Sequence, residues 1–224
     1  MINFWISLNK QKVENLSKQL VKFNRKHSFN AIENNHYNHI RDIFLTLIST
    51  ETLNEPINIL DYGSNILTIS NLQNKINCKK VKFDIYDPFF KKGIYNYSHI
   101  KYVKFKIINR FNKITKNKYL IVNFGSSIQY EKDIFNKLSL LNFRKTKYIV
   151  ITSTPLSFKK KYESKQSGKK NVTQYIHSFH KIINFFKKRN FKLVFKSRNN
   201  RKNIACDKVK FKTHSLNIIL RNAK

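Results

Sequence analysis

The stretch Ile57-Asn-Ile-Leu-Asp-Tyr-Gly-Ser-Asn65 decides the fold of this chain. Residues 57–60 form an apolar run that is long enough for one buried strand. Asp61 and Gly63 follow it directly. A glycine there lets the backbone turn with positive φ and lets a ligand come close, while the carboxylate can accept hydrogen bonds from a ribose or an amino group. The stretch therefore predicts either a strand leading into a nucleotide-type pocket or an ordinary turn from strand to helix.

Strands and helices are expected to alternate after this point. Periods of two or continuous apolar runs predict the strands, and apolar residues three and four apart predict the helices. Strands are expected at 57–60, 81–87, 100–105, 119–124, 148–152 (stopped by Pro155), 191–195 and 215–220, helices at 10–26, 40–50, 66–76, 131–141 and 173–189, and a mobile loop at 158–172.

This alternation predicts an α/β protein with a mostly parallel central sheet of about seven strands and helices on both faces. The final two strands are joined by a connection without a helical pattern, so we expect them to form a C-terminal antiparallel hairpin. Residues 1–50 should form an N-terminal helical segment that packs on one domain, residues 51–224.

The charge of the chain is strongly positive. It has 45 Lys and Arg against 12 Asp and Glu, a formal net charge of +33 over 224 residues. Such a charge is typical of proteins that bind nucleic acid or anionic lipid. The excess of Lys, Asn, Ile, Phe and Tyr is also the bias of an AT-rich genome, and the basic residues are spread along the chain. A nucleic-acid partner therefore stays open but is not favoured, because no recognition motif is visible.

Compartment and membrane signals are weak. We expect no signal peptide, and no apolar run approaches the ~20 residues needed to span a bilayer. The basic amphipathic helix expected at 10–26 fits peripheral contact with an anionic membrane, although packing on the flank of the domain is more common for such a helix. Cys78 and Cys206 lack the spacing of a metal site, and a reducing cytoplasm fits them.

Polar residues stand at the ends of three of the expected strands. In an open parallel sheet, ligands bind beyond the carboxyl ends of the strands. The sheet should therefore bring together the side chains at these ends, which are Asp61 with Gly63, Asp87, and Asn123 with Gly125 and Ser126.

The order of these motifs resembles the class I S-adenosylmethionine-dependent methyltransferases, which implies a Rossmann-like fold. The segments Phe124-Gly-Ser-Ser-Ile-Gln-Tyr130 and Tyr148-Ile-Val-Ile-Thr-Ser-Thr-Pro-Leu156 resemble, more narrowly, a bacterial methyltransferase branch associated with surface-polysaccharide biosynthesis. Two features depart from the pattern. Ser153 stands where that branch has an arginine, and in the first turn Gly63 is followed by Ser64 and Asn65 where the family has further glycines.

The resemblance implies S-adenosylmethionine as the cofactor and assigns residues to it. The implied cofactor-binding residues are Asp61, Gly63 and Ser64 at the methionine end, Asp87 at the ribose, and Asn123, Phe124 and Gly125 at the adenosine and methyl region. Asp84 is the alternative to Asp87, although it lies inside its strand. The implied acceptor-site residues are Ser126, Gln129 and Tyr130.

No catalytic residue is identified by a motif. Tyr130, His177 and His180 are candidates, because a histidine titrates near neutral pH and residues three apart share one face of the expected helix. His36 and His39 have the same spacing. Neither histidine pair has a third ligand in view, so we expect no metal site.

These observations favour an enzyme that transfers a methyl group to a hydroxyl or amine of a small molecule or surface-glycan precursor. Such a transfer is an in-line displacement that depends on positioning, and a general base helps when the acceptor is a hydroxyl. Two alternatives stay open: a basic RNA-binding protein or RNA methyltransferase, and a degenerate methyltransferase-like domain without cofactor. The single-glycine turn supports the last of these.

Overall fold

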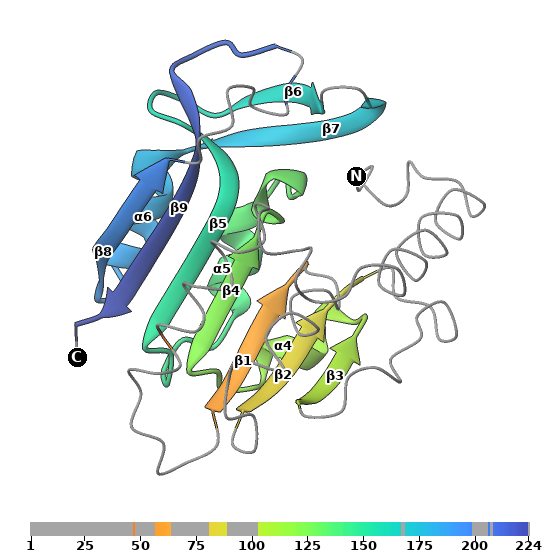
Figure 1. The fold of residues 1–224 in the computed structure, drawn as a ribbon, viewed down its shortest axis with the longest axis vertical. Helices are drawn as coiled ribbons and strands as arrows, with labels where there is room; N and C mark the ends of the chain where they lie inside the picture. The colour runs from red at the N-terminus through yellow and green to blue at the C-terminus, as the bar shows by residue number, and fades with distance from the viewer. Residues whose placement is uncertain are drawn as a thin grey trace, which may run out of the picture.

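A computed structural model of the chain describes residues 47, 57–63, 81–88, 103–166, 169–198, 206 and 208–223. In this part of the chain nine strands form one sheet in the order β3-β2-β1-β4-β5-β7-β6, and β9 pairs with both β5 and β8 (Figure 1). The strands are β1 Ile57–Tyr62, β2 Val81–Tyr86, β3 Lys104–Ile108, β4 Ile121–Gly125, β5 Tyr148–Ser157, β6 Tyr162–Gln166, β7 Lys169–Ser178, β8 Phe191–Arg198 and β9 Thr213–Asn222.

The first five strands are parallel, as predicted. β1 lies between β2 and β4, and its Asp61 is in register with Asn123 of β4. β4 in turn pairs with β5, where Gly125 is in register with Thr152. Because the three strands run in the same direction, the polar residues at their carboxyl ends meet at one edge of the sheet.

The predicted C-terminal antiparallel pair is confirmed. β8 and β9 run antiparallel, and β9 also pairs antiparallel with β5, in which Ile151 is opposite Ile218. Both strands are longer than predicted. β8 lies at the edge of the sheet, and Leu193 to Lys196 are exposed. Because apolar and polar residues alike are exposed there, the sequence pattern does not show where the strand ends.

The prediction for residues 158–189 is wrong in two places. The expected loop contains β6, in which buried Tyr162 and Ser164 alternate with exposed Glu163 and Lys165, the period of a half-buried strand. The expected helix 173–189 is in fact strand β7 followed by α6, Phe179–Lys187. β6 and β7 form an antiparallel hairpin that adds two strands to the predicted seven.

The prediction that Pro155 stops the fifth strand is also wrong. β5 continues to Ser157, and Pro155 lies opposite Ser215 of β9. The pairing shifts register between Ile151 and Thr154, and Ser153 there has φ 50°. A proline cannot donate to a strand ladder and is tolerated at such an irregularity.

Three short helices cover one face of the sheet (Figure 1). They are α4 Phe111–Thr115, α5 Ile134–Leu140 and α6. A cluster of 22 buried apolar residues joins them to the strands, with Phe124, Phe179 and Phe186 among its large side chains. A second cluster, on the opposite face, includes Ile59, Val150 and the helical residue Leu47.

Several predictions lie outside the described residues. These are the helices at 10–26 and 66–76, the first residues of the strand at 100–105, all of the helix at 40–50 except Leu47, and the residues Ser64, Asn65, His36, His39 and Cys78. In the part of the chain that the structure describes, no helix is both long and apolar enough to cross a membrane.

Candidate functional site

A buried polar pair joins the carboxyl ends of β1 and β4. Asn123 Nδ2 donates a hydrogen bond of 2.7 Å to Asp61 Oδ1, and both side chains are buried. Asn123 Oδ1 has no hydrogen-bond partner among the described residues. A buried polar atom in this state costs about 1–3 kcal/mol, so this position is suited to a ligand that donates a hydrogen bond.

The turn after β1 depends on Gly63. Its φ is +67°, and a Cβ placed on it would lie 2.5 Å from Ser127 Cβ. Its N–H donates to the Tyr86 carbonyl at 2.8 Å. The turn is therefore held against the segment after β4 on one side and against β2 on the other. The structure brings Gly63 and Asp61 to the same edge as Asn123, as the sequence predicted.

The two acids of β2 have different surroundings. Asp84 accepts hydrogen bonds of 3.0 Å from Asn117 Nδ2 and from the Tyr119 hydroxyl. Asp87 follows the last residue of β2, and its N–H donates to the Ile108 carbonyl at 3.0 Å. Burial of Tyr119 and the nearby Asp84 raise the pKa of that tyrosine. Asp84 is thus enclosed by a structural network inside the sheet, whereas Asp87 stands at the edge where the site lies.

Two serines have left-handed backbone, Ser126 directly after β4 and Ser153 at the register shift inside β5. Ser126 has φ 54° and Ser153 has φ 50°, a conformation that costs about 1–3 kcal/mol for a residue with a side chain. Ser126 Oγ donates to the Ser153 carbonyl at 3.2 Å, and Ser153 N–H donates to Asn217 Oδ1 at 2.9 Å. These hydrogen bonds hold the turn after β4 against the register shift in β5.

Gln129 and Tyr130 lie on a short 3₁₀ helix, η3, Ile128–Tyr130. Gln129 Nε2 donates to the carbonyl and Oγ of Ser126, at 2.7 and 2.9 Å, and so fixes the strained turn. The Tyr130 hydroxyl lies 3.4 Å from Gln166 Oε1 and 3.5 Å from Gln174 Nε2. The predicted acceptor-site residues are therefore brought together with the unpredicted β6–β7 hairpin.

Glu131, which the sequence did not single out, ties three elements together. Its Oε1 accepts from the Tyr62 hydroxyl at 3.1 Å, and its Oε2 forms an ion pair with Lys137 of α5 at 2.6 Å. Its backbone carbonyl accepts from His177 Nε2 at 2.9 Å. Burial and the Glu131 carboxylate raise the pKa of Tyr62. As one of 12 acids in a chain so rich in lysine, Glu131 could have been noticed by its rarity.

The two candidate histidines do not share a helical face. His177 is 1% exposed on β7, and its Nε2–H donates to the carbonyls of Ile128 and Glu131. Burial, with a smaller effect of Lys161, lowers its pKa to about 4, so it is neutral near pH 7. His180 is exposed on α6, beside the ring of Phe158. His177 therefore holds the hairpin to η3, and His180 lies on a different element.

No metal site takes shape in the described ranges, where no group of three His, Cys, Asp or Glu side chains could hold an ion. Thr152 is a further polar residue at the edge of the sheet that the sequence did not single out. Its Oγ1 is buried and, within the same ranges, has no hydrogen-bond partner. Asp61, Asn123 and Thr152 thus form a polar row over three neighbouring strands.

Comparison with known proteins identifies the fold. No family model matches the sequence, and no curated protein matches it. Among solved structures, the 1,6-didemethyltoxoflavin-N1-methyltransferase of Burkholderia thailandensis, with bound 1,6-didemethyltoxoflavin and S-adenosylhomocysteine, is 10% identical. The match covers 93% of this chain and 88% of that one, with a TM-score of 0.54.

A second similar structure is the CurJ carbon methyltransferase, which is 8% identical. The match covers 84% of this chain and 54% of that one, with a TM-score of 0.53. At such low identity the likeness is one of fold. The chain has the Rossmann-like methyltransferase fold, with its mostly parallel sheet and its closing antiparallel strands.

Proposed function

We propose that this chain is a class I methyltransferase that uses S-adenosylmethionine as its methyl donor. The observation that carries the proposal is the gathering of Asp61, Gly63, Asp87 and Asn123 at one edge of a sheet with this fold. One fold can host many functions, so the argument rests on these side chains and on what they can bind.

The residues present fit the cofactor. Asn123 Oδ1 and Ser127 Oγ are buried and, within the described ranges, lack a hydrogen-bond partner, so two acceptors are available for an amino group or hydroxyls. Gly63 and Gly125 keep the backbone open beside them, since a Cβ on Gly125 would lie 3.2 Å from Asn123 Nδ2. Both features suit a polar ligand that lies against the strand ends.

In this proposal each residue has a defined role. The Asp61–Asn123 pair and the Gly63 turn hold the methionine end, with Ser64 next to them in sequence, and Asp87 holds the ribose hydroxyls. Gly125 lines the side nearest the acceptor. The side chain of Phe124 is buried beside Tyr62 in the apolar cluster under the helices, so only its backbone could contact the cofactor. When bound, S-adenosylmethionine supplies an electrophilic methyl group on a sulfonium. The chain contributes the alignment of the acceptor with that methyl group, which can lower the barrier by several kcal/mol.

The acceptor group in this proposal is a hydroxyl or an amine of a small molecule or surface-glycan precursor. Ser126, Gln129 and Tyr130 stand beyond β4, where an acceptor would enter. His177 is a poor general base, because it is buried and its pKa is about 4. Tyr130 is the nearer candidate to contact the acceptor, although burial raises its pKa and suits it to hydrogen bonding.

A matched pair of carboxylates tests this function. Asp87→Asn should abolish binding of S-adenosylmethionine in a calorimetric titration, because a neutral amide replaces the charged acceptor for the ribose hydroxyls. Asp84→Asn is the control, since Asp84 is as buried as Asp87 but is held by Asn117 and Tyr119. The proposal is supported if the wild type and Asp84→Asn bind S-adenosylmethionine with micromolar affinity and Asp87→Asn does not. No heat and no thermal stabilisation of the wild type at millimolar ligand would refute it.

A further inference from the structure

The edge strand β8 exposes a run of consecutive residues. In the part of the chain that the structure describes, β9 is its only partner strand. A strand with one covered face alternates buried and exposed residues, whereas residues 192–196 of β8 are all exposed. Side chains on both faces of this strand therefore reach the surface. We call residues 192–198 the β8 edge.

The centre of the β8 edge is apolar. Leu193, Val194 and Phe195 are 38%, 55% and 38% exposed. Among the described residues two other large apolar side chains are exposed, Leu140 and Val209, and neither has an exposed apolar neighbour in the sequence. Single exposed apolar residues are normal on a protein surface, whereas a contiguous run marks a site of interaction. The β8 edge is therefore a candidate docking surface.

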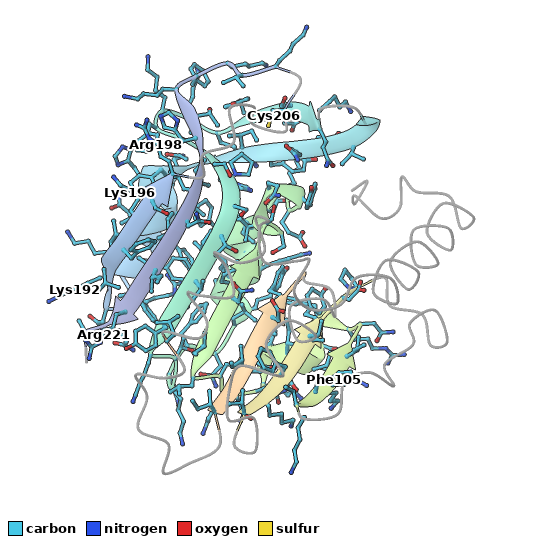
Figure 2. The ribbon with its side chains drawn as sticks, viewed as in Figure 1. Phe105, Lys192, Lys196, Arg198, Cys206 and Arg221 are labelled. Atoms are coloured by element: carbon cyan, nitrogen blue, oxygen red, sulfur yellow. The ribbon has the colours of Figure 1, made fainter. Side chains whose placement is uncertain are left out.

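The edge strand β3, at the other end of the sheet, has a different surface. Its apolar residues Phe105 and Ile107 are partly buried and pack against the core. Lys104 and Lys106, which alternate with them, are exposed. Figure 2 shows Phe105 on the opposite side of the molecule from Lys192. Exposed apolar side chains are thus a feature of β8 that this second edge strand does not share.

Cations flank the apolar residues of the β8 edge. Figure 2 shows Lys192, Lys196 and Arg198 spaced along β8, with Arg221 beside them. Arg221 is in register with Lys192 on the neighbouring strand β9, and all four side chains are exposed. Neither β8, β9 nor α6 contains an Asp or a Glu, so no carboxylate within these elements offsets the positive charge.

Helix α6 extends the cationic surface. Its first residue, Phe179, has Lys196 Nζ 5.4 Å from the centre of its ring, and near its other end the ring of Phe186 lies 6.0 Å from that of Phe191. The helix therefore runs alongside β8. Its exposed cations are Lys181 and Lys187. A flat partner that meets the β8 edge thus meets positive charge on both strand and helix.

The β8 edge is poorly suited to pairing with another strand. The pairing of β8 with β9 shifts register between Leu193 and Phe195. Such irregularities, and lysines on an edge strand, are devices that prevent further strand addition. A second copy of this chain would also bring Lys192 and Lys196 against like charges, and each chain has a formal net charge of +33. The partner is therefore an anionic surface other than a strand.

The exposed side chains favour a lipid surface over a nucleic acid. Nucleic-acid bases stack on open aromatic faces. Here the most exposed apolar side chain is the aliphatic Val194, and the ring of Phe185 on α6 is covered by the Arg189 guanidinium at 3.7 Å. At a bilayer surface, aliphatic and aromatic side chains enter the boundary between headgroups and acyl chains, while Lys and Arg meet anionic headgroups.

We infer that the β8 edge docks the protein on an anionic membrane surface. Leu193 and Val194 enter the boundary between headgroups and acyl chains, and Lys192, Lys196 and Arg198 contact the anionic headgroups. β5 and β9 separate β8 from β4 in the sheet, so docking by this edge leaves the candidate site uncovered. This inference does not depend on the proposed function.

The test is flotation of the full chain with lipid vesicles, without S-adenosylmethionine. One set of vesicles is phosphatidylcholine alone, and the other is phosphatidylglycerol and phosphatidylcholine in equal parts. Val194→Gln is compared with Val209→Gln, since the two valines are 55% and 51% exposed. Val209 also stands between two lysines, but it lacks an apolar neighbour. Urea denaturation checks that each variant is folded.

A second matched pair tests the charges. Lys192→Gln/Lys196→Gln removes two cations from the β8 edge, and Lys104→Gln/Lys106→Gln removes two exposed cations from β3 at the other end of the sheet. The net charge of the chain falls equally in the two variants. A difference between them therefore reports where the protein touches the vesicle.

We expect the wild type to bind the anionic vesicles and to leave phosphatidylcholine alone unbound. Val194→Gln should weaken binding about fivefold, as loss of one buried apolar side chain would. Lys192→Gln/Lys196→Gln should weaken it at least about tenfold, because each cation near an anionic bilayer contributes about fivefold. The two control variants should bind as the wild type does.

Four results would overturn the inference. The first is absence of binding to the anionic vesicles. The second is an equal loss for the two lysine variants with no effect of Val194→Gln, which would show adhesion through net charge. The third is binding of a single-stranded RNA that depends on Lys192 and Lys196 while the vesicles stay unbound. The fourth is a dimer in sedimentation that Val194→Gln dissociates. None of these results bears on binding of S-adenosylmethionine, which is titrated separately.

Discussion

The two ends of strands β1, β4 and β5 differ in chemistry although they belong to the same face of the sheet. At the amino-terminal ends, Ile57, Ile121 and Tyr148 are buried in one apolar cluster. At the carboxyl ends, the corresponding positions are Asp61, Asn123 and Thr152, which are equally buried. The apolar end stabilises the fold. At the polar end Asn123 Oδ1 and Thr152 Oγ1 have no hydrogen-bond partner among the described residues, so they cost stability unless something binds them.

Backbone geometry follows the same division. The amino-terminal ends pair regularly, whereas positive φ occurs at Gly63 and Ser126, directly after β1 and β4, and at Ser153, level with them inside β5. Residues in such conformations persist where the surrounding structure holds them, and they are frequent at functional sites. The comparison indicates that the amino-terminal ends of these strands contribute mainly to stability and the carboxyl ends mainly to ligand binding. Substitutions at the two ends can test this division.

Gly63→Ala should have the largest effect. An added Cβ meets Ser127 Cβ at 2.5 Å on a backbone with φ +67°, so strain and overlap together should lower the free energy of unfolding by about 4 kcal/mol. Urea denaturation measures this loss. Gly125→Ala is the control, because its Cβ would be 3.2 Å from the Asn123 side chain. Equal losses for the two variants would show that the Gly63 turn is not special.

Ile59→Ala and Asp61→Asn, two residues apart on one strand, should separate stability from binding. Ile59 is fully buried, so its truncation should cost about 3 kcal/mol and leave the affinity of the folded protein for S-adenosylhomocysteine unchanged. Asp61→Asn keeps the shape of the side chain and should lower that affinity at least tenfold with a small change in stability. The reverse pattern in denaturation and titration experiments would contradict the division between the two strand ends.

His177 should make stability depend on pH. Its pKa in the folded protein is about 4, below the ordinary value of 6.5, so below pH 6.5 the unfolded chain binds a proton that the folded chain refuses. Stability is therefore full above pH 6.5 and is lost as the pH falls towards 4. His177→Gln should reduce the difference between urea midpoints at pH 7 and pH 5, because glutamine can donate to the same carbonyls without titrating. His180→Gln, at an exposed position, should leave that difference as in the wild type.

Ser153→Gly should have the smallest effect on stability. Glycine adopts φ 50° without strain, which outweighs its greater freedom in the unfolded chain and should stabilise the protein by about 0.5–1 kcal/mol. Asn190→Gly, at φ 65° after α6 and far along the chain from the site, should stabilise it similarly. Both changes are measured as shifts in Tm. Ser153→Gly keeps the backbone carbonyl to which Ser126 Oγ donates, so methyl transfer should change little in either variant.

The sequence predicted most of the parallel sheet because its strands are buried and apolar. Most side chains of residues 57–60, 119–124 and 148–152 are apolar. Such short apolar runs are the pattern of a buried strand. The acids and glycines after them are visible as breaks in that pattern. Asp61, Gly63, Asp87 and Asn123 could therefore be named from the sequence, and the parallel register brings them to one edge.

The hairpin and its contacts could not be predicted in the same way. In residues 173–178 the adjacent apolar residues Tyr175 and Ile176 fit a buried strand as well as a helix. Pairing with β6 makes this segment a strand, and the local sequence pattern does not contain that information. Gln174 and Glu131 gained their positions from contacts with residues more than 30 positions away. Pro155 was taken as a stop, but a register shift in the pairing with β9 accommodates it.

Hydrogen–deuterium exchange with and without S-adenosylhomocysteine tests the central claim most directly. If the carboxyl ends bind the cofactor, peptides that contain Asp61 to Gly63, Asp87 and Asn123 to Tyr130 should become protected, while those of the amino-terminal ends stay unchanged. The claim would be contradicted if the ligand protected none of these segments, or if protection appeared at the amino-terminal ends instead.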